Sequence, residues 1–302
     1  MLRPPFPAVL DSSIMAAFKS CPQSFNLGYL SHWKPQGISV HLHAGAAYAK
    51  GLEMARKAYY EEGKDSDTAV ATGLGALLLA YGDYQCPADS AKSAERTAGA
   101  LEYYFSRYPL DEDDAKPLLL PSGKRGIEFS FVEPLSVRHP ETGDPIVYCG
   151  RMDMICEKGG MKLGEDDKTA SQLGASWPKQ WDLRSQFTGY VWGAAQAGIK
   201  LDGFLVRGVS ILKTKYDTME AITYRPQWQI DRWEDQLYRD IARMQRMWEE
   251  GHWDYNLDHA CAEYGGCQFR QVCLMRDPTA LLEQQFERKV WDPINRTEHR
   301  VD

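Results

Sequence analysis

The chain has 302 residues, of which 43% are hydrophobic and 25% charged, and its formal net charge is −7 at pH 7. This composition is typical of a globular protein with a buried core, and the negative charge weighs against nucleic-acid binding over a broad basic surface. No apolar run reaches about 18 residues, so no membrane span is predicted. Prolines interrupt the N-terminal segment where a signal peptide would be continuously apolar, so we expect a cytoplasmic protein.

The first predicted element is a helix within residues 10–33. Ser12 or Ser13 can cap its N-terminus, and apolar residues recur behind them at helical spacing. Cys21 lies in this segment directly before a proline. A lone cysteine of this kind is usually a small core residue.

A helical region is predicted from residue 44 to residue 120. Residues 40–64 have strong helix propensity and small side chains that allow close packing. Segments 66–83 and 88–108 are predicted as two more helices, and an acidic, proline-bearing break follows.

From Gly126 the apolar pattern changes to a period of two, which predicts a strand that carries Glu128. Two further strands, Val147–Ile155 and Lys162–Lys168, are predicted on either side of a glycine turn. This hairpin would place Asp153 on its first strand beside Asp166 on its second.

The hairpin combines the side chains that a hard divalent cation requires. Asp166 and Lys168 are two residues apart, so on an extended strand they point to the same face. Two converging carboxylates beside an ammonium group suit Mg²⁺ and an activated water. The alternative is a solvated hairpin, because acidic clusters near turns are usually exposed.

The next predicted elements are a helix at Asp182–Ala197 and a hairpin formed by residues 202–214 and 219–225. The helix places Gln186 and Tyr190 one turn apart, an amide and a phenol that are commonly a solvent residue and a core residue. A long helix, Trp228–Gly251, follows with arginines that acidic residues interrupt, which favours an ordinary salt-bridged surface.

Three cysteines lie close together near the C-terminus, and core packing does not explain them. Cys261, Cys267 and Cys273 are spaced six apart around a glycine pair. Zinc would need four tetrahedral ligands at short paired spacings, whereas an iron–sulfur cluster accepts a fourth thiolate from a distant element. Cys21 is the candidate for that fourth ligand. The other cysteines, Cys86, Cys149 and Cys156, look like bystanders.

The order Gly150-x-x-Asp153, then Asp166-x-Lys168-Thr169, resembles the core of the PD-(D/E)xK nucleases and, within them, the RecB-like exonuclease branch. The helix with Gln186 and Tyr190 follows the second strand as in that branch. The context of Cys21 and the three later cysteines are similar to the iron–sulfur members, which include CRISPR-associated exonucleases and the AddB nuclease domain. Two departures stand out: Ala49 occupies the place of a metal-binding histidine four residues after Gly45, and the first gap between the C-terminal cysteines is wider than usual.

The resemblance implies a role for each matching residue. Asp153, Asp166 and Lys168 would be catalytic, and Mg²⁺ or Mn²⁺ would be bound by the two aspartates with the backbone carbonyl of Asp167. Glu53 or His43 could replace the missing histidine, and Glu128 could join the acidic cluster. The DNA-binding residues would be Gln186, Tyr190, Thr169 and Ser171, and the [4Fe–4S] ligands would be Cys21, Cys261, Cys267 and Cys273.

The implied fold is a single restriction-endonuclease-like α/β domain spanning residues 1–302. It would comprise a mixed central sheet flanked by helices (126–225), a helical insertion (44–120), and a C-terminal helix with a cysteine-ligated staple (228–276). The implied activity is a metal-dependent DNA exonuclease on single strands or ends, in a bacterial or phage-infected cell. The resemblance also leaves room for a protein partner in a recombination, replication or CRISPR-related complex.

Two alternatives remain open at this point. A non-catalytic iron–sulfur DNA-binding subunit could retain the nuclease fold as a scaffold, and the absence of the histidine at Ala49 motivates this alternative. A zinc-stapled protein-interaction module would contain zinc instead of iron.

Overall fold

The computed structural model describes residues 3–37, 39–262 and 266–295. The chain divides into two compact units, each built from separate stretches of sequence. The first unit comprises residues 1–37, 132–150 and 231–296, and the second comprises residues 38–131, 151–230 and 297–302. The prediction of a single domain remains a prediction.

The main sheet is mixed, and over the described residues its strand order is β1-β5-β6-β7-β8, with β3 and β4 also paired to β5. Its core consists of β5 (Pro145–Lys158), β6 (Met161–Ala170), β7 (Gly203–Ile211) and β8 (Tyr216–Tyr224). β5 pairs antiparallel with β6, β6 parallel with β7, and β7 antiparallel with β8. Two glycines close the tight turn between β5 and β6, because Gly159 and Gly160 both have positive φ (57° and 78°).

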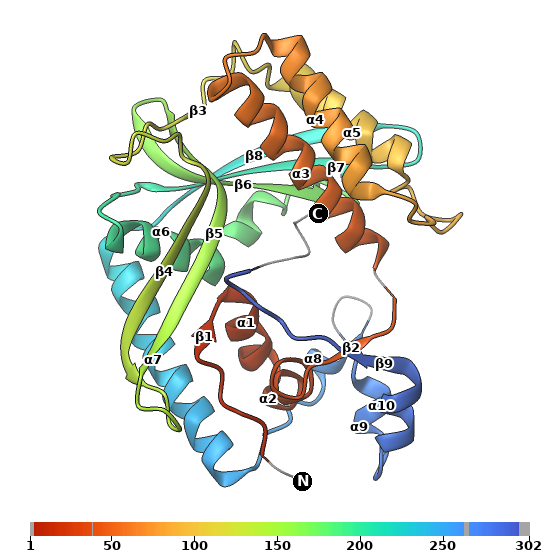
Figure 1. Ribbon diagram of the computed structural model, residues 1–302, viewed down its shortest axis with the longest axis vertical. Helices are drawn as coiled ribbons and strands as arrows, with labels where there is room; N and C mark the ends of the chain where they lie inside the picture. The colour runs from red at the N-terminus through yellow and green to blue at the C-terminus, as the bar shows by residue number, and fades with distance from the viewer. Residues whose placement is uncertain (1–2, 38, 263–265, 296–302) are drawn as a thin grey trace. The chain divides into compact units, whose positions relative to one another are not determined.

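Helices cover both faces of the sheet in the second unit (Figure 1). One face carries α3 (Val40–Tyr60), α4 (Ser66–Tyr81) and α5 (Ala94–Arg107), which share an apolar core with Val209 and Ile211 of β7. The opposite face carries α6 (Ser185–Gln196), where Phe187 stacks on Phe204 with ring centroids 4.3 Å apart. The predicted mixed α/β architecture, a central mixed sheet flanked by helices, is therefore confirmed.

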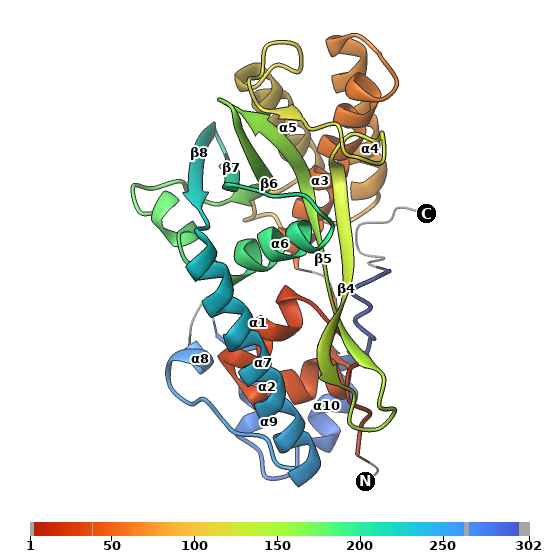
Figure 2. The ribbon, with the colours of Figure 1, turned by 90° about the vertical axis from the view of Figure 1, so that its left-hand side faces the viewer.

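The remaining elements of the second unit are β3 (Lys116–Pro117) and a short 3₁₀ helix, η2 (Pro178–Trp181). β4 (Ile127–Arg138) and β5 are long strands that run side by side and belong partly to each unit (Figure 2). The expected order of helix, three strands, helix and two strands is present as α3, β4, β5, β6, α6, β7 and β8.

The first unit is mainly helical. It contains β1 (Val9–Leu10), α1 (Ser12–Ser20), α2 (Pro22–Phe25), the π-helix η1 (Asn26–Leu30) and β2 (Trp33–Pro35). It also contains most of α7 (Gln227–Glu250), and then α8 (His259–Ala262), α9 (Arg270–Cys273), α10 (Thr279–Gln285) and β9 (Phe286–Arg288). β2 and β9 form a separate antiparallel pair.

Two helix predictions need correction. Asp11, and not Ser12 or Ser13, caps α1, because its Oδ1 accepts a hydrogen bond from the backbone N–H of Ile14 (2.8 Å). The predicted first helix is also broken at Cys21, where extended backbone separates α1 from α2 before Pro22.

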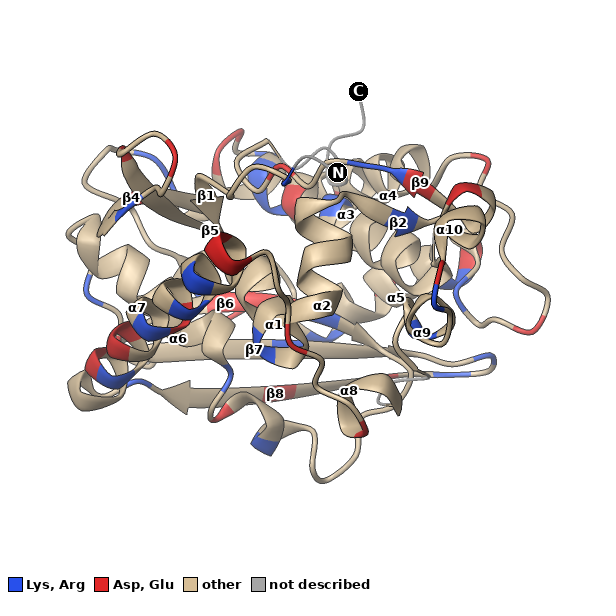
Figure 3. Cartoon of the chain, turned by 90° about the horizontal axis from the view of Figure 1, so that it is seen from below, with Lys and Arg blue, Asp and Glu red and all other residues tan. Residues whose placement is uncertain are grey.

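Acidic and basic residues alternate along α7 (Figure 3). Arg239 pairs with Asp235 at 2.9 Å, and Arg243 pairs with Asp254 at 3.0 Å. These pairs agree with the salt-bridged surface expected for this helix. Among the described helices, none combines the length and apolar character that crossing a bilayer demands.

Candidate active site

The β5–β6 hairpin brings Asp153 and Asp166 together. The strand pairing ends with Met154 opposite Glu165, and Asp153 and Asp166 are the next residues on each strand. The two strands remain linked past the last paired residues, because Asp153 Oδ2 accepts a hydrogen bond from the backbone N–H of Asp167 (2.8 Å). The adjacency that the hairpin pattern predicted is therefore present.

The two carboxylates lie in a crowded environment, in which Asp166 is buried and Asp153 half-buried. Burial, followed by the charges of Asp166 and Glu128, holds the pKa of Asp153 well above its usual value. Burial also raises the pKa of Asp166, although Lys168 opposes this shift. Both carboxyl groups therefore resist ionisation unless a positive charge is added nearby.

Lys168 supplies part of that positive charge. Its ammonium group forms an ion pair with Asp166, and the Lys168 side chain is 32% exposed. Burial alone would lower the pKa of Lys168, but Asp166 and Asp153 raise it above its usual value. Lys168 is thus a protonated hydrogen-bond donor in this arrangement.

Glu128 joins the same cluster from β4. Burial raises the pKa of Glu128 to about 7. The charge of Arg151 opposes this shift, whereas the negative charge of Glu53 adds to it. Arg151 binds the Glu128 carboxylate at 3.0 Å. The backbone of Glu128 has a positive φ of 55°, which is uncommon for a residue other than glycine and is frequently found at functional sites.

The two candidates to replace the missing histidine lie in different places. Glu53 on α3 is close enough to raise the pKa of Glu128, and its oxygens also bind Lys50 (3.1 Å) and Lys57 (2.6 Å). His43 is held elsewhere: its Nε2 lies 2.8 Å from the carbonyl oxygen of Tyr81, and its ring stacks on Tyr84. Glu53 is therefore the candidate that lies at the carboxylate cluster.

The opposite face of β6 is a network of buried ion pairs. Arg56 of α3 binds Glu165 (2.6 Å) and Asp167 (2.7 Å), and all three side chains are at most 4% exposed. Arg56 also donates to Tyr104 Oη (2.9 Å). Arg207 of β7 reinforces this network through Asp113 (2.5 Å) and Glu220 (3.0 Å).

This network agrees with the expectation that Asp167 would contribute its backbone, and not its side chain, to a metal site. The side chain of Asp167 is engaged by Arg56, so it does not point to Asp153 and Asp166. Alternation along β6 gives the same result, since residues 165 and 167 face one side and residues 166 and 168 the other. At the carboxylate cluster, Asp167 contributes only its backbone.

Gln186 and Tyr190, expected among the DNA-binding residues, are bound to each other on α6. Gln186 Nε2 donates to Tyr190 Oη (2.9 Å), and Tyr190 is 1% exposed between Phe131 and Phe204. A buried ring offers no face to an unpaired base. The pair instead lies next to the carboxylate cluster, because Tyr190 is one of the groups that influence Lys168.

Thr169 and Ser171 follow Lys168 at the end of β6. Thr169 Oγ1 accepts a hydrogen bond from the ammonium group of Lys92 (3.1 Å). Ser171 is exposed just beyond the strand.

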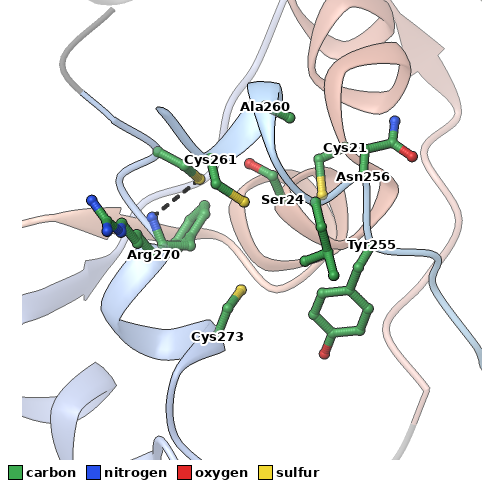
Figure 4. A pocket seen from close by; sticks show the side chains of 11 residues that line it. Cys21, Ser24, Tyr255, Asn256, Ala260, Cys261, Arg270 and Cys273 are labelled. Carbon is green, nitrogen blue, oxygen red and sulfur yellow. Dashed lines mark hydrogen bonds between the residues drawn. The ribbon is translucent and has the colours of Figure 1, made fainter. Parts of the chain in front are cut away.

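All four predicted cluster cysteines line one pocket of the first unit. The labelled Cys21, Cys261 and Cys273 direct their sulfur atoms toward a common space (Figure 4). Cys267 Sγ accepts a hydrogen bond from the backbone N–H of Phe269 (3.4 Å). Burial raises the pKa of the Cys273 thiol, and the other three cysteines raise it further.

Two observations bear on whether metals fit these sites. In residues 3–37, 39–262 and 266–295, no three His, Cys, Asp or Glu side chains are close enough to hold one ion as they stand. Mg²⁺ is usually held by only one or two carboxylates together with water and substrate oxygens, so Asp153 and Asp166 fit it. The four thiols line one pocket, and four thiolates are a ligand set that either a tetrahedral zinc ion or an iron–sulfur cluster can use.

Several residues of the site were not predicted from the sequence. Arg56 and Lys92 contact β6 from distant positions in the sequence, and Arg151 of β5 binds Glu128. Arg184, exposed at the start of α6, lowers the pKa of Asp166. Arg151 and Arg184 have a usable local signal, because each stands two residues before a predicted site residue, Asp153 or Gln186.

Comparisons with known proteins do not assign a family. No family model matches the chain, and no curated protein matches it. A solved structure from Eubacterium rectale, named "Putative exonuclease", aligns with 85% of this chain and 88% of its own at 14% identity and a TM-score of 0.48. The protein SSO0001 aligns with 74% of this chain and 82% of its own at 13% identity and a TM-score of 0.28. At these values neither likeness assigns an activity to this chain.

Proposed function

We propose that this protein hydrolyses phosphodiester bonds of DNA with the help of Mg²⁺ or Mn²⁺. The observation that carries the proposal is the pair of neighbouring carboxylates, Asp153 and Asp166, with Lys168 bound to one of them. Crowding these groups in a partly buried site is unfavourable by itself. A divalent cation would remove that penalty.

The cation would be held by Asp153 and Asp166, with the backbone carbonyl of Asp167 as a further oxygen ligand. When bound, it supplies positive charge to the phosphoryl oxygens and lowers the pKa of a water molecule. Glu128 and Glu53 adjoin the two aspartates and can orient water in the outer shell.

Lys168 would orient the attacking water, since its protonated ammonium can donate to it or to a phosphoryl oxygen. The exposed Arg184 would neutralise the phosphate beside Asp166. Gln186 and Tyr190 would position Lys168 from α6 and not contact a base. An exonuclease acting on single strands or ends is the form of this activity that the resemblance to RecB-like nucleases supports.

We further propose that the first unit binds a [4Fe–4S] cluster through Cys21, Cys261, Cys267 and Cys273. Their convergence on one pocket from the junction between α1 and α2 and from the C-terminal segments supports this proposal. Such a cluster would tie together segments of the first unit that are some 240 residues apart in sequence, without taking part in cleavage.

The nuclease proposal is tested with end-labelled single- and double-stranded DNA in Mg²⁺ or Mn²⁺. We expect progressive shortening by the wild type, its loss in EDTA, and its loss in Asp166→Asn and Lys168→Ala. Glu102→Gln, which changes an exposed carboxylate on α5, is the matched control and should cleave normally. Undiminished cleavage by both site variants would sink the assignment, and DNA binding without cleavage would instead support the non-catalytic scaffold.

The cluster proposal is tested by anaerobic purification followed by an absorption spectrum and iron and zinc analysis. Iron near four per chain, lost in Cys267→Ala and kept in Cys86→Ala, is the expected result. Zinc in place of iron would support the zinc-stapled alternative.

A further inference from the structure

We propose that Arg151 binds an internal phosphate of the nucleic-acid strand beside the carboxylate cluster, and that Glu128 positions Arg151 for this contact. The proposal deepens the nuclease proposal and rests on it for the identity of the ligand. Phosphate binding by Arg151 is measured as DNA affinity, which does not require cleavage.

Arg151 lies on the same face of β5 as Asp153. The two residues are two positions apart on the strand, so alternation directs both side chains to one side, with their Cα atoms about 7 Å apart. Glu128 links them, because its carboxylate binds Arg151 and its charge raises the pKa of Asp153. All three residues belong to the second unit. Contacts within one unit therefore place Arg151 at the carboxylate cluster.

Most of the hydrogen-bonding capacity of Arg151 is unused. A guanidinium group has five N–H donors. Within the described part of the chain, the side chain of Arg151 makes a single polar contact, from Nε to Glu128 Oε2 at 3.0 Å. Its two terminal nitrogens, which carry four of the five N–H groups, are left for another partner. The side chain is 31% exposed, so a ligand can reach these donors from solution.

Two other arginines of the same unit show how a purely structural guanidinium is bound in this protein. Arg207 and Arg225 are buried, and each uses all three of its nitrogens. Their partners are carboxylates, hydroxyls and a carbonyl of the protein itself. Arg151 differs in both respects, since it is accessible and is bonded through its inner nitrogen alone.

The open end of the Arg151 guanidinium suits a phosphate. The two terminal nitrogens form a planar fork that matches two oxygens of a phosphate group. Beside a site that is proposed to cleave DNA, the anion to be bound is a phosphodiester of the substrate. The charges that act most on the pKa of Asp153 do not include Arg151. We therefore assign to Arg151 a phosphate next to the one that is cleaved, where it positions the strand.

Glu128 has the features of a positioning residue for Arg151. Its side chain is only 15% exposed, and it holds the inner nitrogen, which fixes the direction in which the terminal nitrogens project. Its positive φ of 55° is a conformation that residues other than glycine keep mainly where the surrounding contacts enforce it. The orientation of Arg151 is therefore set by a residue that is itself constrained.

The first test measures binding of a labelled single-stranded oligonucleotide with a 5′-hydroxyl end, in Ca²⁺ to limit cleavage. Arg151→Met should weaken binding by about tenfold and reduce the slope of log Kobs against log salt by about 0.7. Arg151→Lys keeps the charge but not the fork, so it should keep the slope and recover only part of the affinity. Arg107→Met, at an exposed arginine on α5, is the matched control and should change neither quantity.

Several outcomes would overturn the assignment. Unchanged affinity and salt slope in Arg151→Met would do so even if the wild type is an active nuclease. A loss of affinity that comes with a lower Tm and an unchanged slope would show that Arg151 serves the fold. A loss confined to 5′-phosphorylated DNA would exclude an internal phosphate. If the wild type binds DNA without cleaving it and Arg151→Met binds as expected, the phosphate contact stands and the nuclease proposal fails.

Cleavage kinetics separate a neighbouring phosphate from the cleaved one. At saturating DNA in Mg²⁺, kcat of Arg151→Met should stay within about threefold of the wild type, because the lost contact is made equally before and during cleavage. A fall in kcat of about a hundredfold with unchanged affinity would place Arg151 at the cleaved phosphate and overturn the assignment.

The positioning role of Glu128 is tested by two variants that remove the same charge. Glu128→Gln can still accept a hydrogen bond from Arg151 Nε, whereas Glu128→Ala cannot. We expect Glu128→Ala to bind the oligonucleotide several-fold more weakly than Glu128→Gln, and this difference to disappear in the Arg151→Met background. Equal affinities of the two variants when Arg151 is present would overturn the positioning role.

Discussion

The carboxylates on the two faces of strand β6 differ in how far protein cations neutralise them. On one face, the Glu165 and Asp167 carboxylates are bound by the Arg56 guanidinium, in a network that includes Arg207. On the other face, Asp166 has one lysine for a partner and lies against Asp153. The first face is compensated by protein cations and is suited to fix the strand. The second is short of positive charge, which is what a cation-binding catalytic site requires.

The largest expected effect breaks the compensated face. Arg56→Met leaves Glu165 and Asp167 without their guanidinium, and we expect the free energy of unfolding to fall by about 3–5 kcal/mol. Urea unfolding measures this change. Arg107→Met, at an exposed arginine on α5, should stay within about 0.5 kcal/mol of the wild type. A similarly small loss for Arg56→Met would mean that the network does not stabilise the fold.

Asp153→Asn tests the opposite face. The amide keeps an oxygen that can accept from the backbone N–H of Asp167, while the negative charge is removed. We expect DNA cleavage to fall by about 10²–10³-fold, with a Tm of the metal-free protein at pH 8 that is equal or higher. A clearly lower Tm would show that Asp153 serves the fold, as Arg56 does.

The pH dependence of stability should reveal the carboxylates whose pKa is raised by burial. The pKa of Glu128 is raised from 4.5 to about 7 in the folded protein. Its contribution to stability is therefore fully present below about pH 4.5 and is lost as the pH rises through 7. In EDTA, we expect the Tm to fall by roughly 3 °C or more between pH 5 and pH 8.

Two controls sharpen this measurement. Glu128→Gln should reduce the slope but not abolish it, because burial also raises the pKa of Glu165 to about 7. Addition of Mg²⁺ at pH 8 should restore stability, since the ionised carboxylates bind it. A Tm that rises with pH in EDTA over this range would contradict the proposed charge balance.

The smallest expected effect concerns the link between α6 and the carboxylate face. Tyr190→Phe removes the hydroxyl group to which Gln186 donates and should cost about 1 kcal/mol of stability. If Tyr190 positions Lys168, kcat should fall several-fold while the affinity for DNA is unchanged. A weaker affinity with an unchanged kcat would instead support direct contact of this pair with DNA.

Local patterns predicted the strands and the core of the site well. The two-residue period identified β4, and the glycine turn identified β5 and β6 and set the register of their hairpin. Because a tight turn leaves little freedom of register, Asp153 and Asp166 had to be neighbours. The spacing of the cysteines similarly indicated a shared site, and the pocket contains all four.

Long-range packing decided what the sequence could not. Arg56 is 111 residues from Asp167 and Lys92 is 77 from Thr169, so no local period relates either pair. The burial of Tyr190 on α6 likewise depends on Phe131 of β4 and Phe204 of β7. The sequence by itself determined which charged residues share strand β6 and on which face each lies, because alternation is a local property of a strand. Only the tertiary structure decided which face receives arginines and which is left to bind a cation, because that depends on which helix packs against each side.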